Sequence, residues 1–84
     1  MEAYVIILEG YESHKVIDIK FDGESAITCA EEYCVERCEE CDLDMDEIFV
    51  KSDPFVCDCK LPIIHTWENN TIGEWIHVYK KESF

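Results

Sequence analysis

The hydrophobic and polar positions of this chain follow two different periods, and these periods predict a mixed α and β fold. Short apolar or alternating runs, which are typical of strands, end at turn-forming residues such as Gly10 and Pro54. The first two runs should pair as a β-hairpin, with Ile17, Ile19 and Phe21 on one face of the second strand. The predicted strands occupy residues 4–8, 16–21, 47–51, 55–61, 63–67 and 72–80.

A helical period replaces the strand pattern between Ser25 and Glu47. Ser25 follows the turn-like pair Asp22-Gly23 and is a suitable N-cap residue. Apolar residues then recur at steps of three and four, which places them on one stripe of an α-helix: Ile27, Ala30, Cys34, Cys38, Cys41 and Met45. We therefore expect a helix over residues 25–47 whose apolar stripe packs against the strands.

The last two strands should form a second hairpin, whose register depends on the turn. A two-residue turn at Asn69-Asn70 would pair Trp67 with Ile72, His65 with Glu74 and Ile63 with Ile76. One face would then be apolar, with Ile63, Trp67, Ile72, Ile76 and Val78, and the other would turn toward solvent, with Ile64, Trp75, His77 and Tyr79. A longer loop would instead slip the register by one and bury Trp75 and Tyr79.

These elements together predict a single α+β domain over residues 1–84. Its order is an N-terminal β-hairpin, one acidic amphipathic helix, then three to four antiparallel strands, with the helix packed on one face of the sheet. A chain of 84 residues is long enough for one domain, and its apolar fraction of 48% is normal for a globular protein. A disordered chain is therefore not expected.

The polar side of the predicted helix is almost entirely acidic. Between positions 31 and 47, nine acids accompany one base, Arg37, so this segment contributes −8 of the formal net charge of −13. A face that only keeps a protein soluble usually mixes lysine with glutamate, and this one does not, although a solvated face remains the alternative interpretation. The predicted partner-binding residues are Glu31, Glu32, Glu36, Glu39, Glu40, Asp42, Asp44, Asp46 and Glu47, with an aromatic strip of Trp75, His77 and Tyr79 as a second interface anchor.

The net charge also restricts the class of partner. A charge of −13 argues against direct contact with nucleic acid or with an anionic membrane. It favours a basic partner, such as a nucleic-acid-binding protein or a ribonucleoprotein complex. The chain shows no signal-peptide pattern and no run of about 20 apolar residues that would span a membrane. We therefore expect a cytoplasmic protein.

The cysteines admit three interpretations. Most would pack as reduced thiols in the core, because free cysteine behaves as a small hydrophobic residue. The pairs Cys38-x-x-Cys41 and Cys57-x-Cys59 also resemble a four-thiolate zinc site, although two thiols on a regular strand lie about 6.5–7 Å apart. Disulfides are not typical of a cytosolic chain. Cys29, close to the acidic side, should be the most reactive of the six, which are Cys29, Cys34, Cys38, Cys41, Cys57 and Cys59.

No catalytic motif is visible. Asp42-x-Asp44-x-Asp46 matches the first three ligand positions of an EF-hand, but Glu47 stands where the loop needs glycine and Asp53 where it needs glutamate. The chain also lacks a phosphate-binding loop and a nucleophile elbow. We therefore predict no enzymatic activity, no metal and no cofactor.

The length, the acidity and the order of elements resemble the small phage-encoded proteins known as anti-CRISPR proteins. The opening Met1-Glu2-Ala3-Tyr4-Val5-Ile6 leads into a hairpin, and a helix follows Glu24-Ser25. This resemblance implies a phage inhibitor that acts as a DNA mimic, occupies the nucleic-acid-binding surface of a CRISPR effector complex and blocks target-DNA binding. The residues themselves leave two other functions open, a small zinc-binding module and an acidic adaptor that binds through the aromatic strip.

Overall fold

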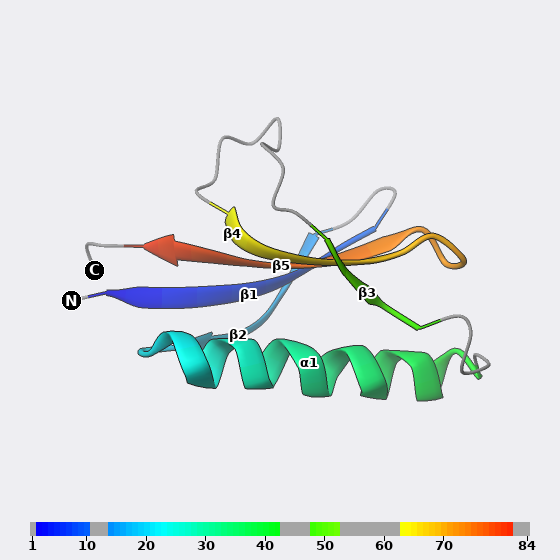
Figure 1. The fold of residues 1–84 in the computed structure, drawn as a ribbon, viewed down its shortest axis with the longest axis horizontal. Coiled ribbons are helices and arrows are strands. Elements are labelled where there is room, and N and C mark those ends of the chain that lie inside the picture. Colours follow the sequence, from blue (N-terminus) through cyan, green and yellow to red (C-terminus); the bar gives the residue numbers. More distant parts are fainter. Residues whose placement is uncertain (1, 11–13, 43–47, 53–62, 82–84) are drawn as a thin grey trace.

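A computed structural model describes residues 2–10, 14–42, 48–52 and 63–81. Within those ranges, the elements are β1 (Ala3–Glu9), β2 (His14–Lys20), α1 (Gly23–Glu40), β3 (Val50–Ser52), β4 (Ile63–Asn69) and β5 (Glu74–Lys81). This confirms the predicted α+β order, and Figure 1 shows α1 lying along one face of the sheet. In the described part of the chain, no helix is both long and apolar enough to cross a membrane.

The strands form one antiparallel sheet in the spatial order β2-β1-β5-β4-β3. β1 pairs with β2 along one edge and with β5 along the other. Its β-branched run is buried on both faces, since Val5, Ile6 and Ile7 are at most 6% exposed. The outer strand β2 is mostly exposed. The sequence thus places its most apolar strand near the middle of the sheet.

The core lies between α1 and the face of the sheet that α1 covers. Its completely buried side chains come from both layers: Ala26 and Ala30 of α1, Ile6 of β1, and Ile76 and Val78 of β5. Cys34 and Cys38 continue the buried stripe of the helix, as predicted, whereas Ile27 and Cys41 are half-buried. The apolar stripe of α1 therefore packs against the sheet.

α1 begins and ends earlier than the sequence predicts. Asp22 is the N-cap in place of Ser25, because its Oδ1 accepts a hydrogen bond of 2.8 Å from the Ser25 backbone N–H. The helix ends at Glu40, with Cys41 as its C-cap, and Asp42 follows in the left-handed region at φ 54°. The predicted continuation over residues 43–47, which includes Met45, lies outside the described residues.

A register shift in the β1–β2 pair divides the apolar residues of β2 between two faces. Ile17 packs against the core, whereas Ile19 pairs with Val5 on the opposite face. Phe21 lies beyond the strand and is 64% exposed. The prediction that Ile17, Ile19 and Phe21 share one face is therefore wrong, since an extra residue moves the side chains that follow it to the other face.

The last hairpin keeps most of its predicted faces but not its predicted register. Residues 70–73 form the loop, so Trp67 pairs with Ile76 instead of Ile72. Gly73 closes the loop at φ 64°, a conformation that glycine adopts at little cost. The pairing differs from the prediction by an even number of positions, so Trp67 and Ile76 still face the helix.

A second register shift exchanges the predicted positions of Ile63 and Ile64. Ile63 pairs with Tyr79 on the face away from α1, whereas Ile64 packs against the core. β3 at Val50–Ser52 stands in place of the predicted strand at 47–51. The predicted strand at 55–61 lies outside the described residues.

Candidate functional site

The outward side of α1 carries a row of exposed carboxylates, as the sequence predicts. We call Glu31, Glu32, Glu36, Glu39 and Glu40 the acidic face, and all five are exposed. Asp42 is also exposed just beyond the helix, while Asp44, Asp46 and Glu47 lie outside the described residues. Carboxylates four residues apart repel one another, and acids near the C-terminal end oppose the helix dipole. Packing of the opposite stripe against the sheet supplies the stability that this side of the helix lacks.

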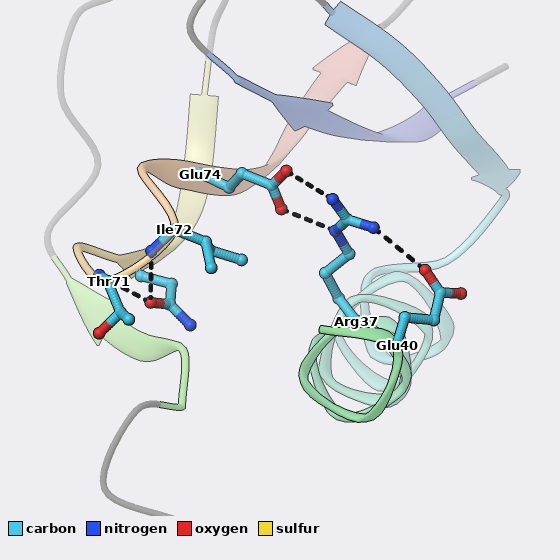
Figure 2. Close-up of polar contacts among 6 residues, drawn as sticks. Arg37, Glu40, Thr71, Ile72 and Glu74 are labelled. Atoms are coloured by element: carbon cyan, nitrogen blue, oxygen red, sulfur yellow. Dashed lines mark hydrogen bonds and ion pairs between the residues drawn. The ribbon is translucent and has the colours of Figure 1, made fainter. Parts of the chain in front are cut away.

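Arg37 points from α1 toward the sheet and also contacts Glu40 at the margin of the acidic face. Figure 2 shows its guanidinium meeting Glu74 at the start of β5. Its Nε and Nη2 each donate a hydrogen bond of 2.8 Å to the Glu74 carboxylate, and Nη1 donates one of 3.1 Å to Glu40. The hydrogen bonds to Glu74, and to a smaller extent that to Glu40, raise the pKa of Arg37, so its side chain stays charged. The positive charge of the helix is therefore largely used to join α1 to β5.

An apolar groove with a volume of about 660 Å³ opens between the C-terminal half of α1 and the strands β3 and β4. We call it the α1–β3 groove. Two of its apolar side chains, Val35 and Ile48, are 60% and 53% exposed. Among the described residues, those that line it are Glu31, Cys34, Val35, Cys38, Glu39, Asp42, Ile48, Phe49, Lys51 and Trp67. Grooves of this size, with an apolar lining and a few polar groups, are typical of binding sites.

Lys51, on the strand wall of the groove, contacts two neighbouring side chains. Its Nζ lies 2.8 Å from His65 Nδ1 and 4.6 Å from the centre of the Trp67 ring. Burial, and then the charge of Lys51, lower the pKa of His65, so its ring can stay neutral and accept a hydrogen bond from the ammonium. The ammonium of Lys51 therefore interacts with the imidazole of His65 and the ring of Trp67.

The cysteines of α1 are free thiols, and burial makes Cys29 and Cys34 poor nucleophiles. Cys34 and Cys38 are each 8% exposed, and burial raises the pKa of Cys34 to about 12. Cys29 is half-buried near β2, with its Sγ 4.0 Å from Asp18 Oδ2. Burial, and then the charge of Asp18, raise the pKa of Cys29 as well. At neutral pH, Cys29 and Cys34 are therefore protonated rather than activated.

Among the described residues, no group of three His, Cys, Asp or Glu side chains lies close enough to hold a metal ion. Two cysteines of the zinc hypothesis, Cys57 and Cys59, lie outside those residues, as do Asp44 and Asp46 of the EF-hand-like pattern. The zinc module therefore stays a prediction.

Trp75, His77 and Tyr79 share the face of β5 that points away from α1, as predicted. Trp75 and Tyr79 are half-buried, but His77 is only 1% exposed, so the prediction that its side chain faces solvent is wrong. The strip can therefore offer a partner only its two aromatic ends.

The ring of His77 is held between two polar side chains of neighbouring strands. Thr66 Oγ1 lies 2.9 Å from Nδ1, and Glu9 Oε2 lies 3.3 Å from Nε2. A ring that carries its proton on Nε2 can donate to Glu9 and accept from the Thr66 hydroxyl. This order of carboxylate, imidazole and hydroxyl resembles a catalytic arrangement, but Thr66 is completely buried, so a substrate cannot reach its hydroxyl.

Two features of the site were not predicted, the partner of Arg37 and the α1–β3 groove. Arg37 lies seven residues after Ala30, on the buried stripe, and this spacing was a signal that it needs an acidic partner on the sheet. Val35, an apolar residue on the polar side of the helix, was a signal for the groove.

Comparison of the chain with family models, with curated proteins and with solved structures finds no match in any of the three. The functional argument therefore depends on the acidic face and the groove themselves.

Proposed function

We propose that this protein is a non-enzymatic, phage-encoded inhibitor that occupies the basic nucleic-acid-binding surface of a bacterial CRISPR effector complex and blocks target-DNA binding. The observation that carries the proposal is the acidic face, with five exposed glutamates within residues 31–40 of one helix. Arg37, the base within that segment, turns toward Glu74 on the sheet. The exposed side of the helix therefore carries mainly negative charge, with Val35 exposed among the glutamates.

The charge density of the acidic face is close to that of one DNA strand. At a rise of about 1.5 Å per residue, its glutamates place one charge on about every 3 Å of helix axis. One strand of B-DNA carries one phosphate per roughly 3.4 Å. A lysine- and arginine-rich surface built to bind phosphates would therefore meet a high density of negative charge along α1. Such binding should weaken as salt concentration rises, because it releases counterions.

The test measures target-DNA binding by purified, guide-loaded CRISPR effector complexes in a mobility-shift assay with increasing amounts of this protein. We expect inhibition by the wild type and loss of inhibition by the double variant Glu32→Lys/Glu36→Lys. These glutamates lie one turn apart on the acidic face, outside the groove lining and outside the Arg37 contacts.

The control is Glu2→Lys/Glu24→Lys, which changes the net charge equally at two exposed positions outside the acidic face. This control should inhibit like the wild type, and circular dichroism should show the same fold for all three proteins. Equal loss in both variants would mean that net charge alone acts. Full inhibition by Glu32→Lys/Glu36→Lys, or no inhibition by the wild type, would refute the proposal.

A further inference from the structure

The α1–β3 groove combines an apolar floor with acidic side chains along its helix side. Cys34, Cys38, Phe49 and Trp67 are buried side chains that line it, so their packing is already provided by the fold. Val35 on the helix is different, since 60% of it is exposed although it lines the groove. Further apolar contact is therefore possible without any rearrangement of the core.

The acids at the rim determine which occupant fits. Glu31, Glu39 and Asp42 line the helix side of the groove, and all three are exposed. Lys51 is the cation among the described residues that line the groove, and its Nζ lies 2.8 Å from His65 Nδ1 and 4.6 Å from the centre of the Trp67 ring. An occupant therefore meets apolar surface in the middle and exposed carboxylates along the helix side.

We propose that the groove binds a basic amphipathic segment of a protein partner. Its apolar side chains would pack on the exposed Val35 and Ile48, and its lysine or arginine side chains would pair with Glu31, Glu39 and Asp42. This is the arrangement by which amphipathic segments bind grooves, with apolar anchors inside and charges at the rim. The inference rests on the proposed function in one respect, that the partner is basic. It adds that an apolar contact, and not charge alone, fixes where the partner sits.

Charge also argues against a second copy of this chain as the occupant. Each copy carries a net charge of −13, and the rim itself is acidic, so two copies would bring like charges together.

The decisive variant is Val35→Glu, because charge and apolar contact then predict opposite results. If the groove only attracts positive charge, an additional carboxylate strengthens binding of a basic segment. If the segment is anchored by apolar contact, the same change weakens it. Ile48→Glu tests the opposite wall in the same way. The matched control is Val16→Glu, which adds the same charge at a 58% exposed valine on β2.

The probe is a peptide of roughly 18 residues, about five helical turns, made of leucine and lysine in helical periodicity. An oligolysine peptide of the same length is the comparison. Trp67 lines the groove, so its fluorescence can report binding in a Trp75→Phe background, which removes the other of the two tryptophans. Circular dichroism checks that each variant is folded.

We expect the leucine–lysine peptide to bind the wild type and Val16→Glu alike, and to bind Val35→Glu and Ile48→Glu at least about tenfold more weakly. Equal or tighter binding to Val35→Glu overturns the proposal, and so does oligolysine binding as tightly as the leucine–lysine peptide. A concentration-dependent dimer in sedimentation that Val35→Glu dissolves would assign the groove to a second copy and also overturn it.

The same variants separate this proposal from the proposed function. If Val35→Glu binds the peptide normally while Glu32→Lys/Glu36→Lys loses inhibition of DNA binding, the groove inference fails and the proposed function stands. If Val35→Glu loses the peptide while no effector complex is inhibited by the wild type, the proposed function fails and the groove inference stands.

Discussion

The two faces of the sheet are buried by different means, although they are built from alternate residues of the same strands. On the face that α1 covers, Ile76 and Val78 of β5 are completely buried among apolar side chains. On the opposite face, the residue between them, His77, is equally buried but is bonded to Thr66 and Glu9. The first face is therefore stabilised by apolar burial, and the second also depends on satisfied hydrogen bonds.

This difference shows that alternation alone does not assign an inside and an outside to a strand. A strand with one covered face should carry polar residues on the other. β5 and β1 instead bury residues on both faces, and a polar residue that is buried must find partners. His77 finds them on the neighbouring strands β1 and β4. The two faces should therefore respond differently to mutation.

The largest effect is expected on the covered face. Ile76→Ala leaves a cavity beneath α1 and should lower the free energy of unfolding by about 2–5 kcal/mol. Urea unfolding under reducing conditions, followed by circular dichroism, measures this loss. The control Val50→Ala, at a 59% exposed position, should change stability by less than about 0.5 kcal/mol. Similar losses in both variants would contradict a core between α1 and the sheet.

A smaller effect is expected on the opposite face. Thr66→Val keeps the shape of the side chain but removes the hydroxyl that lies 2.9 Å from His77 Nδ1. We expect a loss of about 1–3 kcal/mol, because a buried ring nitrogen loses its hydrogen bond. The control Thr71→Val, at an exposed position, should be nearly neutral. An unchanged stability in Thr66→Val would show that the Thr66–His77 hydrogen bond does not stabilise this face.

The sequence predicts those features of the two faces that depend on residues close together in the chain, and misses those that depend on other strands. The period of two predicted that Trp67 and Ile76 face the helix, and an error of four positions in the hairpin register left that prediction intact. The same period predicted that His77 faces away from α1. Its burial was not predictable, because it depends on Thr66 and Glu9, which come from two other strands. The register shifts near Ile17 and Ile63 were missed for the same reason.

The candidate site divides in the same way. The acidic face was predictable, since its members recur with the helical period within one short segment. The α1–β3 groove was not, because Val35, Ile48 and Trp67 meet only after β3 and β4 are placed beside the helix. Glu74 was likewise missed as the partner of Arg37, which lies 37 residues earlier in the chain.

The contact between Arg37 and Glu74, at the end of the covered face, should contribute less to stability than Ile76 or the hydrogen bond of Thr66. Arg37→Met removes the two-bond contact with Glu74 and should cost about 1 kcal/mol at low salt, because the pair is only partly buried. The loss should shrink in concentrated salt, which screens charge. Lys20→Met, which removes an exposed pair with Asp18, is the control and should cost less. A salt-independent loss would mean that Arg37 acts through packing of its stem.

The smallest loss of stability is expected for an exposed hydrogen bond that lies outside both faces. Its size is the reference against which the losses at buried hydrogen bonds are compared. The Oδ1 of Asp22 accepts from the Ser25 N–H at the start of α1, and this contact lowers the pKa of Asp22 below 3.8. A carboxylate with a lowered pKa stabilises the fold above its unfolded-state pKa, and this contribution is lost as the pH falls through the folded-state pKa. Near neutral pH, Asp22→Ala should therefore have a lower free energy of unfolding than the wild type. This loss should be smaller than the loss caused by Thr66→Val. Well below pH 3.8 the difference should narrow.

Asp22→Asn keeps a side-chain oxygen for the Ser25 N–H but cannot titrate, so it distinguishes the hydrogen bond from the charge. Its stability relative to Asp22→Ala should hardly change with pH, whereas that of the wild type should. Unfolding curves of the three proteins at neutral and acid pH measure both differences. If the stability difference between Asp22→Asn and Asp22→Ala also disappears in acid, the titration of Asp22 is not its cause. Another carboxyl group is then responsible, and the pH dependence cannot be assigned to this cap.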